Sequence, residues 1–129
     1  MALIIRLPFP DAALFPNRKN GKHWTTTSAI KTAQNKDSFY ITKASMNAVG
    51  PQEWSDHIPL SLTYIMPDKR HRDMDNCLAA SKAILDGMAD ALGVNDKRFK
   101  PILIDWVHGD KEGALIAAVG VSIVSGVSL

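Results

Sequence analysis

Apolar positions along the chain recur at strand or helix spacing in several separate segments. Residues 2–7 form an apolar run typical of a short strand, which two prolines would end. Residues 11–27 contain too many proline, asparagine, glycine and basic residues for a regular element, so we expect a long loop there. From Ser28, a good helix-capping residue, apolar positions then recur at helical spacing to Ala48, where a glycine-proline pair would end the helix.

Four more elements follow from the same patterns. Residues 58–66 alternate with a period of two, which is typical of a strand. An apolar stripe over residues 77–92 repeats every three to four positions and predicts a second helix that ends at Gly93. Residues 102–108 and 114–124 then predict two strands that form a hairpin across a turn bounded by glycines.

The predicted order is strand, helix, strand, helix, strand, strand. Each amphipathic helix has to cover an apolar sheet face, so this order indicates an α+β fold. We expect two layers, a mixed sheet of about four strands and two main helices. The 129 residues suit one domain spanning 1–129 and exclude a two-domain enzyme.

The composition, the cysteine content and the apolar stretches of the chain indicate its broad class and compartment. With 46% hydrophobic residues, the chain has the composition of an ordinary globular protein. Its formal net charge of +2 is too small to indicate a binding partner. Its one cysteine, Cys77, cannot form an intramolecular disulfide, and residues 1–10 lack the uninterrupted apolar stretch of a signal peptide, so we expect a cytoplasmic protein. Residues 113–129 carry no charge, but their glycines, serines and alternation favour a buried strand over a membrane span.

The densest polar segment is residues 68–76, between a predicted strand and the second helix. Asp73 and Asp75 are two residues apart, so in an extended chain both carboxylates would point the same way. Mg²⁺ binds such hard oxygen ligands and completes its shell with water and phosphate oxygens. The alternative is structural, because Asp75 or Asn76 could simply cap the helix.

Lys82 and Asp96 could extend this site. Lys82 follows Asp75 by seven residues, which returns it to the same side of a helix at about 10.5 Å along the axis; the alternative is a solvated lysine beside other charged residues. Asp96 is a possible third ligand, yet a helix of about 16 residues would separate it from the pair by about 24 Å. Either the following loop folds back, or Gly87 breaks the helix, or a second subunit supplies the residue.

Basic residues concentrate in three predicted loops, where they could contact phosphates, with aromatic rings in the first loop available for base stacking. The alternative is ordinary solvated loops. No Cys/His pair has zinc spacing, and neither a serine-nucleophile motif nor a glycine-rich phosphate loop is present. The basic clusters are Arg18, Lys19 and Lys22 with His23 and Trp24; Lys69, Arg70 and Arg72; and Lys97, Arg98 and Lys100.

Residues 66–76 (MPDKRHRDMDN) resemble the signature of the RusA family, the small Holliday-junction resolvases of bacteria and their phages. The resemblance continues through residues 82–88 (KAILDGM) and 93–96 (GVND). It also extends back to residues 7–10 (LPFP), to NRK at 17–19 and to the His23-Trp24 pair, so that it covers nearly the whole chain.

The resemblance implies a homodimeric endonuclease that uses Mg²⁺, with Mn²⁺ as a substitute, to cut symmetrically across a four-way DNA junction. Its three aspartates and lysine correspond to Asp73, Asp75, Asp96 and Lys82. Two departures are visible: Asn95-Asp96 stands where an acidic pair is usual, and the segment before Lys82 is longer than in some members. Rival interpretations are a branched-DNA-binding protein without catalysis and a transferase that acts on free nucleotides.

Overall fold

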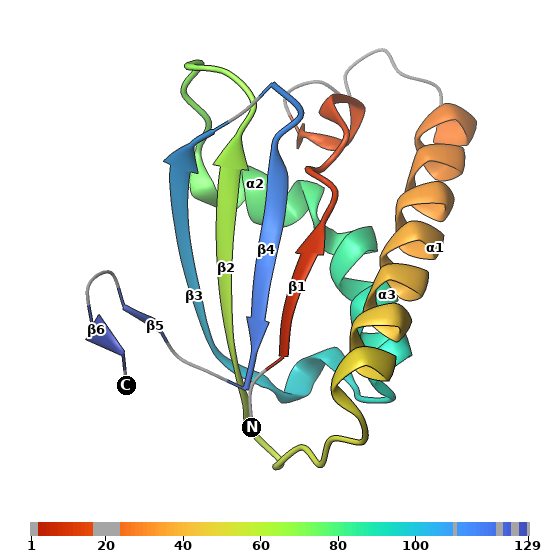
Figure 1. The fold of residues 1–129 in the computed structure, drawn as a ribbon. Coiled ribbons are helices and arrows are strands. Elements are labelled where there is room, and N and C mark those ends of the chain that lie inside the picture. Colours follow the sequence, from red (N-terminus) through yellow and green to blue (C-terminus); the bar gives the residue numbers. More distant parts are fainter. Residues whose placement is uncertain (1–2, 17–23, 110, 121–122, 125–126, 129) are drawn as a thin grey trace.

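The computed structural model describes residues 3–16, 24–109, 111–120, 123–124 and 127–128. Four strands form a mixed sheet in the order β1-β4-β2-β3, in which β3 runs parallel to β2 and the other pairs are antiparallel (Figure 1). This arrangement confirms the predicted α+β fold. The elements are β1 (Leu3–Leu7), η1 (Ala12–Leu14), α1 (Trp24–Val49), β2 (Ile58–Met66), α2 (Met74–Ala80), α3 (Lys82–Leu92), η3 (Asp96–Arg98), β3 (Phe99–His108), β4 (Ala114–Val119), β5 (Ile123–Val124) and β6 (Val127–Ser128).

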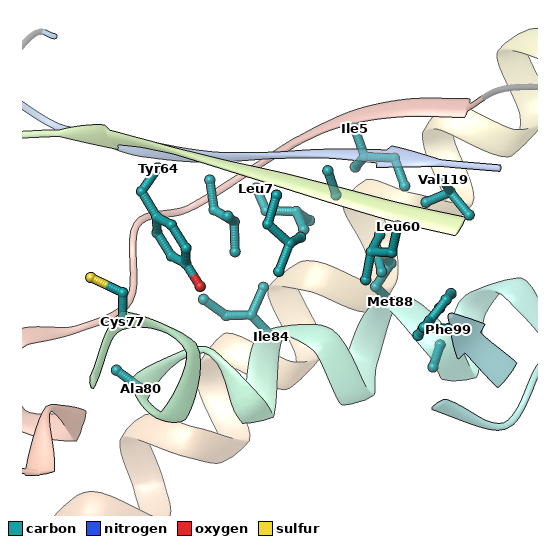
Figure 2. Close-up of a cluster of buried hydrophobic side chains, with 14 of the residues drawn as sticks. Ile5, Leu7, Leu60, Tyr64, Cys77, Ala80, Ile84, Met88, Phe99 and Val119 are labelled. Carbon is teal, nitrogen blue, oxygen red and sulfur yellow. The ribbon is translucent and has the colours of Figure 1, made fainter. Parts of the chain in front are cut away.

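The core lies between the sheet and the helices. Alternate residues of β2 point to one face, and Leu60, Leu62 and Tyr64 are almost completely buried there. They meet the apolar stripe of α3, including Ile84 and Met88. Figure 2 shows Leu60 and Tyr64 from the sheet converging with Ile84 and Met88 from the helix. The period-two pattern of residues 58–66 and the helical period of residues 77–92 therefore identified the two faces that form the core.

The predicted hairpin between residues 102–108 and 114–124 is wrong, because β2 lies between β3 and β4. The backbone N–H of Gly109 donates to the carbonyl of Met66, so the chain leaves β3 beside the end of β2, and β4 pairs with the other side of β2. The α2–α3 crossover returns the chain parallel to β2, as a helical connection between parallel strands does. A glycine-bounded turn looks the same in sequence whether it joins neighbouring strands or steps over one.

The predicted last strand is also shorter than expected. β4 ends at Val119, and the next residue, Gly120, has a φ of +87°, which a residue with a side chain rarely adopts. β5 and β6 form a separate two-stranded pair. Of the helices in the described ranges, none is both long and apolar enough to span a bilayer.

Two other predicted boundaries are corrected. The first helix begins at Trp24 rather than Ser28, so the predicted loop over residues 11–27 gives way to helix earlier than expected. Threonine is a weak helix former, but Thr27 is buried in the structure, and packing outweighs that small preference. Strand β3 begins at Phe99, three residues before the predicted start, and Phe99 is buried against the core.

The predicted second helix is two helices joined at Ser81, and it begins at Met74 rather than Cys77. The Ser81 hydroxyl donates to the Cys77 carbonyl at 2.7 Å and so accepts from the Tyr64 hydroxyl at 2.9 Å. All three side chains are buried. A serine that hydrogen-bonds back onto its own helix commonly bends it, so the break falls at Ser81 and not at Gly87.

Gly87 does not break the helix but lets α1 approach α3 closely. A Cβ at Gly87 would run into the backbone carbonyl of Asn35 on α1. Two side-chain hydrogen bonds from α1 hold the same contact: Asn35 donates to the carbonyl of Ala83 at 3.2 Å and Ser38 to that of Ile84 at 2.5 Å.

Substituting Gly87→Ala tests this close contact. We expect the free energy of unfolding to fall by about 1 to 3 kcal/mol through overpacking, despite the roughly 1 kcal/mol that alanine gains over glycine in a helix. Urea unfolding measures the change, with Asp90→Ala on the exposed side of α3 as the control. A Gly87→Ala protein as stable as its parent would contradict the contact.

Substituting Tyr64→Phe tests the buried hydroxyl pair. Loss of the bond to Ser81 should reduce the free energy of unfolding by about 1 kcal/mol. Burial raises the pKa of Tyr64 from 10.0 to about 12. Because the folded state then holds the proton more tightly, the parent should lose stability as the pH rises from 10 to about 12. Urea unfolding across this pH range should show a smaller loss of unfolding free energy for Tyr64→Phe than for the parent. An equal dependence on pH in the two proteins would contradict the raised pKa of Tyr64.

Candidate metal and nucleic-acid site

Asp73 and Asp75 lie where the loop after β2 enters α2. Asp73 occupies the N-cap position of α2 and has extended backbone angles, but its side chain makes no capping hydrogen bond. Asp75 lies in the first turn of α2 and is also exposed. The Asp73 carboxylate is 63% exposed and lies 3.1 Å from Nε2 of His71. Neither the predicted cap at Asp75 nor one at Asn76 is what begins this helix.

An ion pair between Arg72 and Asp68 orders the loop that leads to Asp73. The guanidinium donates to both carboxylate oxygens, at 2.9 and 3.1 Å, and the backbone N–H of Arg70 also donates to Asp68. The Arg72 side chain is only 10% exposed and lies 5.4 Å from the centre of the Phe9 ring. The hydrogen bonds from Arg72, and to a smaller extent the one from the Arg70 backbone, lower the pKa of Asp68 from 3.8 to about 2.

The predicted phosphate-binding cations divide into engaged and accessible residues. Arg72 is held by Asp68, and Arg98 donates to the carbonyls of Trp54 and Ser55 at 2.9 and 2.8 Å. Lys69, Arg70 and Lys97 are exposed. The other four predicted contacts lie outside the described residues: Arg18, Lys19, Lys22 and His23.

Lys82 and Asp96 line neighbouring cavities between α1 and α3. The first cavity, of about 460 Å³, is lined by Lys31, Lys82 and Asp86, and Lys82 lies 3.7 Å from Asp86. The second, of about 380 Å³, is lined by three aspartates, Asp86, Asp90 and Asp96. Asn35 and Asp86 line both cavities, so the two adjoin along α3, and we refer to them together as the groove.

The groove brings only part of the predicted site together. Ala79 lines its α2 end and lies one helical turn from Asp75, whereas Asp96 lines the other end. Within the part of the chain that the structure describes, no three Asp, Glu, His or Cys side chains are grouped closely enough to hold one metal ion. In Figure 1, α2 lies behind the sheet near the end of β2, while the turn after α3 lies at the opposite end of the sheet.

Two of the three routes that could unite Asp96 with Asp73 are therefore not realised in a single chain. The segment after α3 does not bring Asp96 back to α2, and Gly87 does not break the helix. Contribution of Asp96 by a second subunit stays a prediction.

Several residues of this region were not singled out from sequence. Lys31 and Asn35 are polar positions on a long helix, and nothing in their spacing distinguishes them from a solvated face. Asp68 was counted only as part of a charged run, whereas its position four residues before Arg72 could have suggested the ion pair. Trp106 lay in a predicted strand without any motif.

Two comparisons with known proteins bear on the family. No protein-family model matches the chain. A protein of Xylella fastidiosa (strain Temecula1), described as uncharacterized, is 35% identical over 108 residues, which cover 81% of this chain and 68% of that protein. The chain therefore belongs to the same family as this Xylella protein.

The pKa of Asp68 measures directly whether Arg72 holds the loop. In Arg72→Ala we expect this pKa to rise from about 2 toward the ordinary 3.8, because the two side-chain hydrogen bonds are lost. Lys69→Ala removes a nearby positive charge without removing a hydrogen bond and should leave the pKa near 2. Carboxyl NMR titration distinguishes the two, and an unchanged pKa in Arg72→Ala would contradict the contact.

Proposed function

We propose that this protein is a Mg²⁺-dependent endonuclease of the RusA type that resolves four-way DNA junctions. The observation that carries the proposal is the pair of exposed carboxylates, Asp73 and Asp75, at the start of α2 beside the exposed cations Lys69 and Arg70. The choice of a four-way junction as the substrate rests on the resemblance to the RusA signature, because carboxylates and cations alone suit many phosphodiesters.

The donor set fits Mg²⁺, which takes one or two carboxylates and leaves the rest of its shell to water and phosphate oxygens. Asp73 and Asp75 would hold the ion, and neither carboxylate is used in capping the helix. When bound, the ion would activate water and offset negative charge on the phosphate. Mn²⁺ has the same ligand preference and could replace it.

The chain's own residues would bind and position the substrate. Lys69 and Arg70 would contact phosphates on either side of the cut, and Lys82 would add positive charge near the reacting phosphate. The Arg72–Asp68 pair acts indirectly by holding the loop that carries these cations and Asp73. A loop ordered before binding loses less entropy when DNA arrives.

The proposal includes a homodimer in which Asp96 of the partner subunit completes each site. Its support is the separation of Asp73 from Asp96 within one chain, at opposite ends of α2 and α3. A two-fold dimer would present two sites to the two strands of a two-fold junction.

Replacing Asp73→Asn or Asp75→Asn should lower Mg²⁺-dependent cleavage of a synthetic four-way junction by at least about 100-fold. Junction binding should be equal or tighter, because each change removes a negative charge from the DNA surface. Asp37→Asn, an exposed change on α1, is the matched control and should cut at the parent rate. Parent-rate cleavage by Asp73→Asn would overturn the metal assignment, and binding without cleavage in Mg²⁺ or Mn²⁺ by the parent would favour the non-catalytic alternative.

Mixed dimers test whether Asp96 acts across the subunit boundary. If it does, mixing Asp75→Asn with Asp96→Asn chains leaves one site of each mixed dimer with both native residues, so nicking of one strand should return. Mixing Asp73→Asn with Asp75→Asn chains should stay inactive, because both changes fall in the same half of a site. Gel analysis of junction products measures both mixtures, and an inactive first mixture would contradict the shared site.

A further inference from the structure

Strand β3 carries an aromatic side chain that the helices leave uncovered. Trp106 pairs in register with the buried Tyr64, so both lie on the helix-covered face of the sheet. β3 is nevertheless the edge strand, and Trp106 is 43% exposed. The ring of His108 lies edge-on to the indole, with 5.1 Å between ring centroids, and so limits its orientation.

The surroundings of Trp106 are cationic. The indole lines a small cavity of about 100 Å³ together with Lys69, Arg70, His71, Arg72 and His108, at the end of β3 nearest the loop after β2. Within the described residues, neither Lys69 nor Arg70 makes a side-chain ion pair, and both side chains are exposed. An apolar ring bordered by unpaired cations suits a polyanion that carries flat apolar groups better than it suits a protein surface.

We infer that Trp106 is a stacking site for an unpaired nucleobase at the branch point of the DNA, while Lys69 and Arg70 hold the adjoining phosphates. The inference rests on the proposed function and adds how branched DNA is selected. Bases at a branch point are more easily unstacked than bases within a continuous duplex, so one can leave the stack and lie on the indole.

The experiment compares binding of a synthetic four-way junction and of a continuous duplex at one salt concentration, without divalent ion. Trp106→Leu keeps an apolar side chain but loses the π face, so its affinity for the junction should fall by about 5- to 100-fold, with a smaller loss for the duplex. Trp106→Phe should restore most of the affinity. Ile102→Ala is the matched control, because Ile102 shares the strand and face and is 41% exposed but does not line the cavity.

The outcomes distinguish failure of the stacking site from failure of the proposed nuclease. Parent-like junction binding by Trp106→Leu, equal losses on junction and duplex, or no rescue by phenylalanine would each overturn the stacking site. If the parent binds junctions but does not cut them when Mg²⁺ is added, the proposed nuclease fails, and the variants still decide the stacking site. A parent that binds neither DNA overturns both.

Discussion

The buried hydrogen bond between Tyr64 and Ser81 ties the sheet to the helices that carry the candidate site. Tyr64 projects from the central strand β2 into the core, and Ser81 lies where α2 meets α3. Because Ser81 also bonds back to Cys77, the same hydroxyl bends the helix and fixes the bend beneath β2. The position of this bend determines where Asp75, before it, and Lys82, after it, lie relative to the sheet.

The polar loop after β2 is organised by a second, electrostatic constraint. Arg72 is a cation in a basic segment, yet it is directed inward to Asp68 and the Phe9 ring. Lys69 and Arg70 remain directed to solvent on the same short loop. One cation thus orders the segment, and its neighbours stay available to a negatively charged ligand, a division that residue type alone does not reveal.

The positions of the main strands and helices, and the faces that they bury, could be predicted from the sequence because local periodicity determines them. The alternation in residues 58–66 and the stripe over residues 77–92 identified a strand and a helical region because their buried faces repeat at strand and helix spacing. The pairing of β3 with β2 depends on contacts distant in sequence, so a local turn signal led to the wrong hairpin. The hydrogen bond that ties the bend at Ser81 to the sheet likewise involves Tyr64, seventeen residues earlier. The groove between α1 and α3 joins Lys31 to Lys82, and no spacing rule relates residues on different helices.

The role that we propose for the carboxylates at the start of α2 is metal-dependent cleavage of branched DNA. The most direct measurement incubates the parent protein with an end-labelled four-way junction, with Mg²⁺ and with a chelator, and maps the cuts on all four strands. We expect paired cuts on opposite strands in Mg²⁺ and none with the chelator. An intact junction in both Mg²⁺ and Mn²⁺, at protein concentrations that fully bind it, would contradict metal-dependent cleavage by these carboxylates.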